Sequence, residues 1–76
     1  MQFSLLEAQG PIWEGQAKEV ILPTEEGEMS VLDFHQPFSI KLVKGLLKSA
    51  SQKIQIQEGL AVMKSNKLNV FVERAG

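Results

Sequence analysis

His35 is the single histidine of the chain, and Asp33 lies two positions before it. A histidine acts as a general base when a carboxylate orients its ring and a nucleophile or water lies within reach. Two residues this close on a loop do not supply that geometry, and the sequence carries no recognisable nucleophile motif. The sequence therefore predicts no catalytic residue. It favours a histidine that bonds to the backbone or lies at a subunit contact.

A second group of charged side chains is Glu25-Glu26-Gly27-Glu28, three carboxylates around one glycine. The segment lacks the spaced oxygen ligands of a calcium loop, and one histidine without cysteines does not make a zinc site. Glycine adopts positive φ easily, so the segment predicts a tight turn whose glutamates project into solvent. An exposed acidic turn can also dock on a basic partner surface. No glycine pattern for phosphate binding is present, so we expect no metal and no cofactor.

The composition limits the function classes further. A chain of 76 residues is expected to form one domain over residues 1–76, with a thin core. Without cysteine it has no disulfides, so a supporting partner subunit is a reasonable expectation. The net charge of −1 argues against nucleic acid as a partner. Lysines concentrate in the second half and glutamates in the first, which indicates either solvated faces or a module that docks on two different partners.

The sequence also bears on membrane association. No run approaches the roughly 20 apolar residues of a membrane span, and residues 1–7 lack the basic start and apolar core of a signal peptide. We therefore expect no direct membrane insertion. The location would be the cytosol, or a membrane complex to which the chain is held by other subunits.

The elements that must position these side chains are strands. Apolar residues recur with a period of two in residues 38–42, 53–57 and 68–73, which is typical of strands with one buried face. Glycine, proline and Ser-Asn pairs interrupt the apolar runs, as in a sandwich or barrel. Phe3 and Trp13 are expected to close the ends of the core. The expected strands are residues 2–7, 12–15, 17–22, 29–32, 38–43, 46–49, 53–57, 59–64 and 67–74.

Residues 25–38, Glu-Glu-Gly-Glu-Met-Ser-Val-Leu-Asp-Phe-His-Gln-Pro-Phe, resemble the signature of the epsilon subunit of F-type ATP synthases, which is called delta in mitochondria. That family reads roughly Glu-Gly-Glu-Leu-Gly-Ile-Leu-Pro-Gly-His-Ala-Pro-Leu there, followed by Leu-x-x-Gly. The resemblance continues in order along the chain. Its further pieces are Phe3–Leu6, Ile12–Gly15, Ala17–Pro23, Leu42–Gly45, Glu58–Val62 and Asn66–Val70.

The resemblance implies an all-β fold, a flattened antiparallel β-sandwich of about ten short strands, in a non-catalytic subunit of the central stalk. Such a subunit links the gamma subunit to the membrane c-ring and supports the coupling of proton or sodium transport to ATP synthesis. It would lie peripherally on the cytoplasmic side of a membrane, within the ATP synthase complex. Carried over by position, the c-ring contact is Glu26, Gly27 and Glu28, and the gamma contact is Glu7, His35, Gln36 and Ile40.

The chain departs from the family pattern at several positions. Ser30 stands where the family prefers glycine, Asp33-Phe34 replaces Pro-Gly, and Glu58-Gly59 replaces a glycine pair. The sequence ends where the sandwich would end, without the family's pair of C-terminal helices. This leaves a truncated chain, a naturally short subunit or a diverged paralogue. Autoinhibition and regulatory ATP binding belong to those helices in the family, so we expect neither here.

A second hypothesis comes from a different class of protein. The chain could be a free-standing β-sandwich that binds a peptide or small ligand, since exposed strand edges accept added strands. The rotor hypothesis predicts stable association with a gamma subunit, whereas the ligand-binding hypothesis predicts a monomer that functions alone.

Overall fold

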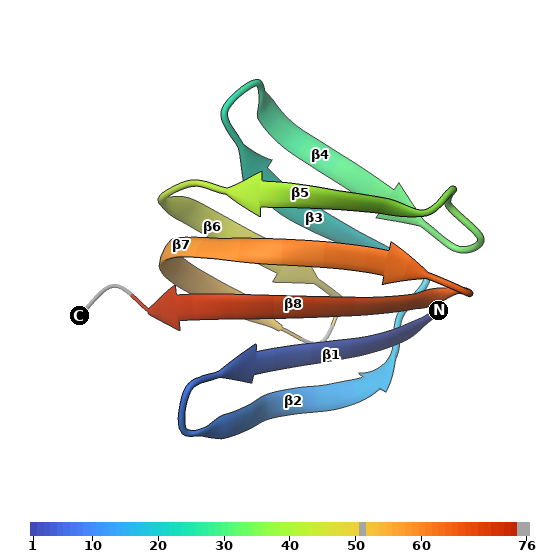
Figure 1. The fold of residues 1–76 in the computed structure, drawn as a ribbon, viewed down its shortest axis with the longest axis horizontal. Helices are drawn as coiled ribbons and strands as arrows, with labels where there is room; N and C mark the ends of the chain where they lie inside the picture. Colours follow the sequence, from blue (N-terminus) through green and yellow to red (C-terminus); the bar gives the residue numbers. More distant parts are fainter. Residues whose placement is uncertain (51, 75–76) are drawn as a thin grey trace.

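The structure is a computed structural model that describes residues 1–50 and 52–74. These residues form strands and turns, which confirms the expected all-β fold (Figure 1). No helix in the described ranges has the length and apolar character needed to span a bilayer. The strands are β1 (Gln2–Glu7), β2 (Gly10–Gln16), β3 (Glu19–Thr24), β4 (Gly27–Leu32), β5 (Phe38–Leu42), β6 (Gly45–Ser49), β7 (Lys53–Lys64) and β8 (Lys67–Arg74).

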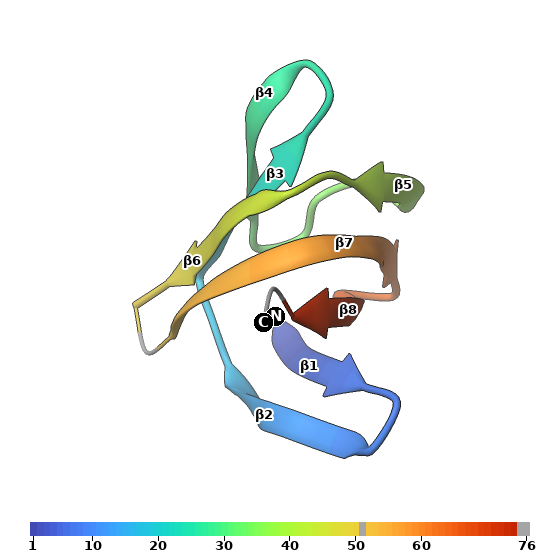
Figure 2. The same ribbon diagram turned by 90° about the vertical axis from the view of Figure 1, so that its left-hand side faces the viewer.

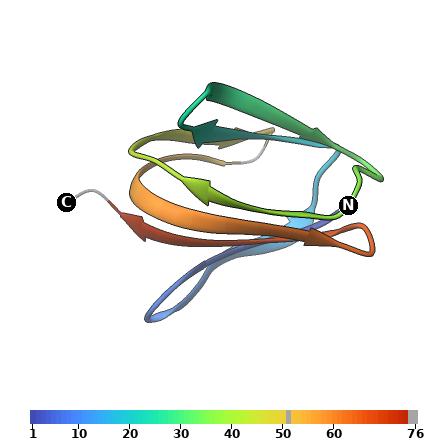
Figure 3. The same cartoon turned by 45° about the horizontal axis from the view of Figure 1, so that its top comes forward.

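One continuous hydrogen-bonded path, β2-β1-β8-β7-β6-β3-β4, folds over to make the two layers. The first part of β7 pairs with β6, while its second part pairs with β5 on one side and β8 on the other. The long strand β7 therefore runs through both layers and joins them, as Figure 2 shows from the side. The path ends at the β1–β2 hairpin and at the β3–β4 hairpin, which project from opposite sides of the molecule (Figure 3).

The number of strands differs from the expected figure of about ten, because the described residues form eight. The expected strands 53–57 and 59–64 are one strand, β7, with a register shift between Ile56 and Glu58. Gly59 does not turn the chain; it pairs with Val72 on β8, and a Cβ built on it would lie only 2.6 Å from the carbonyl oxygen of Phe71. The sequence rule that glycine punctuates strands fails here because this glycine allows two strands to approach closely.

Strand pairing is antiparallel with one exception among the described residues. β1 and β8 are parallel, with Gln2 opposite Lys67 and Leu6 opposite Phe71. The expected antiparallel sandwich therefore contains one parallel pair. Parallel partners come from distant parts of a chain, so the period of two cannot reveal this pairing.

The alternating apolar residues fill the space between the layers. Fourteen buried hydrophobic residues form one cluster, and no polar side chain of the described residues is buried with them. Phe3 is fully buried in this cluster, and the ring of Trp13 packs against it with centroids 5.4 Å apart. The core residues are Met1, Phe3, Leu5, Val20, Leu22, Val31, Leu42, Leu47, Ile56, Ala61, Met63, Leu68, Val70 and Val72.

Candidate functional site

The acidic turn joins β3 to β4 and is held by Thr24, the last residue of β3. The hydroxyl of Thr24 donates a hydrogen bond to the carbonyl oxygen of Gly27 at 2.7 Å and accepts one from the backbone N–H of Glu26 at 3.3 Å. Gly27 has φ of 112°, a left-handed conformation that glycine adopts without a steric penalty. The expected tight turn is therefore present, and its glutamates are exposed.

The three glutamates of this turn are not equivalent. The carboxylate of Glu28 lies 2.9 Å from the ammonium of Lys48 on β6, so a neighbouring cation already compensates its charge. Glu25 and Glu26 lie at the tip, where they border a small hollow of about 180 Å³ shared with Ile40 and Lys41 of β5. The tip itself is thus the part of the turn best placed to present negative charge to a partner.

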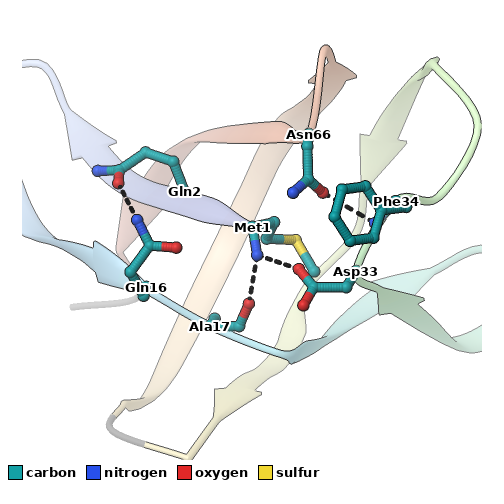
Figure 4. A network of polar contacts seen from close by, with 7 residues as sticks. All are labelled: Met1, Gln2, Gln16, Ala17, Asp33, Phe34 and Asn66. Atoms are coloured by element: carbon teal, nitrogen blue, oxygen red, sulfur yellow. Dashed lines mark hydrogen bonds and ion pairs between the residues drawn. The ribbon is translucent and has the colours of Figure 1, made fainter.

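The His35 loop, residues 33–37, connects β4 to β5 and is tied by hydrogen bonds to Met1, Lys18 and Asn66. The carboxylate of Asp33 accepts a hydrogen bond from the amino group of Met1, and that amino group also donates to the carbonyl oxygen of Ala17 at 2.8 Å (Figure 4). The side-chain oxygen of Asn66 accepts the backbone N–H of Phe34 at 2.8 Å. These bonds hold a loop that lies on the surface.

The ring of His35 is engaged with its own loop rather than with Asp33. Its Nδ1 lies 2.9 Å from the carbonyl oxygen of Gln36, to which it can only donate, and its ring meets that of Phe38 edge-on at 5.1 Å. Since the Asp33 carboxylate binds the Met1 amino group, it does not orient this imidazole. His35 is therefore an exposed residue that bonds to the backbone of its own loop.

The four residues expected at the gamma contact do not form one cluster. His35 and Gln36 precede β5 at one end of the molecule, whereas Glu7 ends β1 at the opposite end (Figure 1). Glu7 receives two hydrogen bonds from the guanidinium of Arg74, both 3.1 Å long. Ile40 lies on β5 between them and packs partly against the core. A single partner that touched all four would have to extend along the sheet.

One apolar feature of the surface was not singled out from the sequence. On the outer face of the sheet, Phe71 lies opposite both Leu6 of β1 and Leu60 of β7. Leu60 is 43% exposed and Phe71 is 49% exposed. With Glu7, Glu58 and Glu73 they line an open hollow of about 420 Å³. The signal was the break in alternation at Phe71, which places an apolar group on the solvent side of its strand.

The comparison with protein families decides the identity of the fold. The family model for the ATP synthase Delta/Epsilon chain, beta-sandwich domain, matches residues 1–76. The chain belongs to this family. The membership agrees with the resemblance read from residues 25–38 and with the two-layered structure.

Two curated relatives from green algae show the extent of the likeness. The chain is 39% identical over 79 residues to the chloroplastic ATP synthase epsilon chain of Tetradesmus obliquus and 36% identical over 85 residues to that of Chlamydomonas reinhardtii. Each alignment covers 99% of the present chain but only 58% and 60% of the two relatives. The chain thus spans somewhat more than half the length of these relatives.

Solved structures give the same fold at lower identity. In the central stalk and c-ring structure of the Tetrahymena thermophila mitochondrial ATP synthase, a matching chain has a TM-score of 0.84 and 14% identity. A chain in the Euglena gracilis mitochondrial ATP synthase has a TM-score of 0.82 and 23% identity. The alignments cover 96% and 97% of this chain, and 63% and 51% of those chains.

Proposed function

We propose that the chain acts as a non-catalytic rotor module of an F-type ATP synthase, linking the gamma subunit to the c-ring and helping to couple ion transport to ATP synthesis. The observation that carries this proposal is the family match over the whole of residues 1–76. The module is held peripherally at the membrane by the complex, on its cytoplasmic side. A closely packed two-layer sandwich deforms little, which suits an element that transmits torque.

In this proposal the acidic turn, Glu25 to Glu28, faces the polar loops of the c-ring. Two of its carboxylates lie at the very end of a hairpin, away from the Lys48 that pairs with Glu28. The gamma subunit lies along the outer face of the sheet, between His35 and Gln36 at one end and Glu7 at the other. The exposed side chains of Leu60 and Phe71 lie between these ends and supply apolar contact area.

The test is association with the cognate gamma subunit. The purified chain is expected to form a stable complex with gamma in size-exclusion chromatography with light scattering, and to hydrolyse no ATP alone. His35→Ala is expected to weaken this complex when affinity is measured by calorimetry. Absence of any complex with gamma, together with unchanged ATP synthesis by an ATP synthase assembled without the chain, would contradict the proposal.

Reversal of charge at the acidic tip tests the c-ring contact. Glu26→Lys is expected to weaken binding of the chain–gamma complex to c-rings by about threefold to tenfold, because exposed charge pairs contribute about 0.2–1 kcal/mol each and a reversal adds repulsion. The matched control is Glu14→Lys, the same change at an exposed position of β2. Equal weakening by both variants would indicate a general charge effect and would remove Glu26 from the contact.

A second candidate function is favoured by the hollow at Leu60 and Phe71. Its volume of about 420 Å³ lies within the range of small-molecule sites, and its lining is largely apolar. A peptide- or ligand-binding module would show ligand-induced NMR shifts clustered around this hollow and away from residues 26–40. Shifts around residues 26–40 on addition of gamma would favour the rotor module instead.

A further inference from the structure

Phe34 combines two unfavourable features at one position. Its backbone has φ of 62°, in the left-handed region where a side chain with a Cβ is strained and where glycine is not. Its side chain is 80% exposed, more than any other large hydrophobic residue of the described chain. A bulky aromatic residue in this conformation is an outlier that calls for an explanation.

The strained conformation is fixed by its surroundings. The backbone N–H of Phe34 donates to the side-chain oxygen of Asn66 at 2.8 Å, and the N–H of His35 donates to the carbonyl oxygen of Leu32 at 3.2 Å. On the other side, the N–H of Asp33 donates to the carbonyl oxygen of Lys18 at 3.1 Å. These bonds hold the backbone of the loop, and the phenyl ring that it carries is exposed (Figure 4).

Neither feature stabilises the isolated chain. The exposed ring gains no burial, and the left-handed backbone would be easier for glycine or asparagine. Strain of this kind is typical of contact sites, and rigid aromatic side chains dominate the binding energy of protein interfaces. An anchor whose backbone is already held in place loses less conformational entropy when it binds.

We propose that Phe34 is an anchor that inserts into an apolar socket with an acidic rim on the gamma subunit; this inference rests on the proposed function. Leu32, two positions earlier in the chain, is 55% exposed and adds to the apolar surface of this segment. The adjoining β7–β8 turn carries Lys64 and Lys67, both exposed and directly opposite each other. Apolar contact at the centre with cations beside it fits a hydrophobic socket bordered by carboxylates.

The position of the loop favours a protein over a membrane surface. Phe34 lies beside His35, at the end of β5 opposite to the acidic turn (Figure 1). If the acidic turn faces the c-ring, the loop that carries Phe34 lies at the end away from the membrane. An aromatic residue with flanking lysines could also bind an anionic bilayer, and the experiment below separates the two surfaces.

Phe34→Gly tests the anchor, because it removes the ring and relieves the backbone strain together. Affinity for the cognate gamma subunit, measured by calorimetry, is expected to fall by about tenfold or more. The melting temperature of the variant is expected to equal or exceed that of the unmodified chain. A loss of binding without a loss of stability is a result that a merely structural role cannot produce.

The matched control is Ser65→Gly, which relieves a similar left-handed residue, φ 53°, in the neighbouring turn without removing apolar surface. This control is expected to bind gamma within about twofold of the unmodified chain.

Equal binding of gamma by Phe34→Gly and the unmodified chain would overturn the anchor while leaving the rotor function intact. Failure of the unmodified chain itself to bind gamma would overturn both. Phe34-dependent binding to phosphatidylserine vesicles with unchanged gamma affinity would assign the ring to a membrane and overturn the socket.

Discussion

Replacing Phe3 with alanine is expected to lower the free energy of unfolding by about 3–5 kcal/mol. Phe3 is fully buried between the layers and packs against Trp13, so the substitution removes a whole ring from the core and leaves a cavity. A domain of this size has a total stability of only about 5 kcal/mol or somewhat more. The variant should therefore be close to unfolding at room temperature, which urea titration followed by circular dichroism would measure.

The matched control for Phe3→Ala is Phe71→Ala, the same change at a ring that is 49% exposed on the outer face. It is expected to lower the free energy of unfolding by less than about 1 kcal/mol, because much of the ring is already in water. Similar losses for the two variants would contradict the core described here. A gamma-binding defect in Phe71→Ala without a loss of stability would agree with the proposed interface.

Replacing Gly59 with alanine is expected to destabilise the chain by about 1–3 kcal/mol. A Cβ at this position would lie 2.6 Å from the carbonyl oxygen of Phe71, and a backbone atom in a paired strand cannot move aside without disturbing β7 and β8. The midpoint of urea denaturation should fall accordingly.

Gly15→Ala provides the comparison, because a Cβ there would also be too close to a neighbour, at 2.7 Å from the ring of Trp13. That neighbour is a partly exposed side chain on the edge strand β2, which can shift. We expect a clearly smaller loss of stability for Gly15→Ala than for Gly59→Ala. The reverse order would show that β7 and β8 can separate locally more easily than their pairing indicates.

Much of the fold could be predicted from periodicity, since each alternating set does bury one face. Leu68, Val70 and Val72 all lie in the core, as their spacing indicates. The bend of β7 through both layers could not be predicted, because Gly59 has the same sequence signature as a turn glycine. The parallel β1–β8 pair was equally inaccessible, since it depends on contacts between distant segments.

The candidate site was predictable where local chemistry decides the conformation. The acidic turn follows from Gly27 and its neighbours, and in the structure a hydrogen bond from the Thr24 hydroxyl to the Gly27 carbonyl oxygen closes it. The left-handed Phe34 was not predictable, because its conformation depends on Asn66, which lies far away in the sequence. Resemblance marked Asp33-Phe34 as a departure from the family, and the structure gives that departure a defined geometry.

The parallel pairing of β1 with β8 also constrains how the protein is made. Among the described strands, β1 is made before the others but finds one of its two neighbours, β8, only after the intervening strands have emerged. Until then Phe3 and Leu5 lie on a strand with an open edge, and contacts so distant in sequence form slowly. The nascent chain therefore passes through a period in which apolar surface and unpaired backbone are open to aggregation or to chaperones.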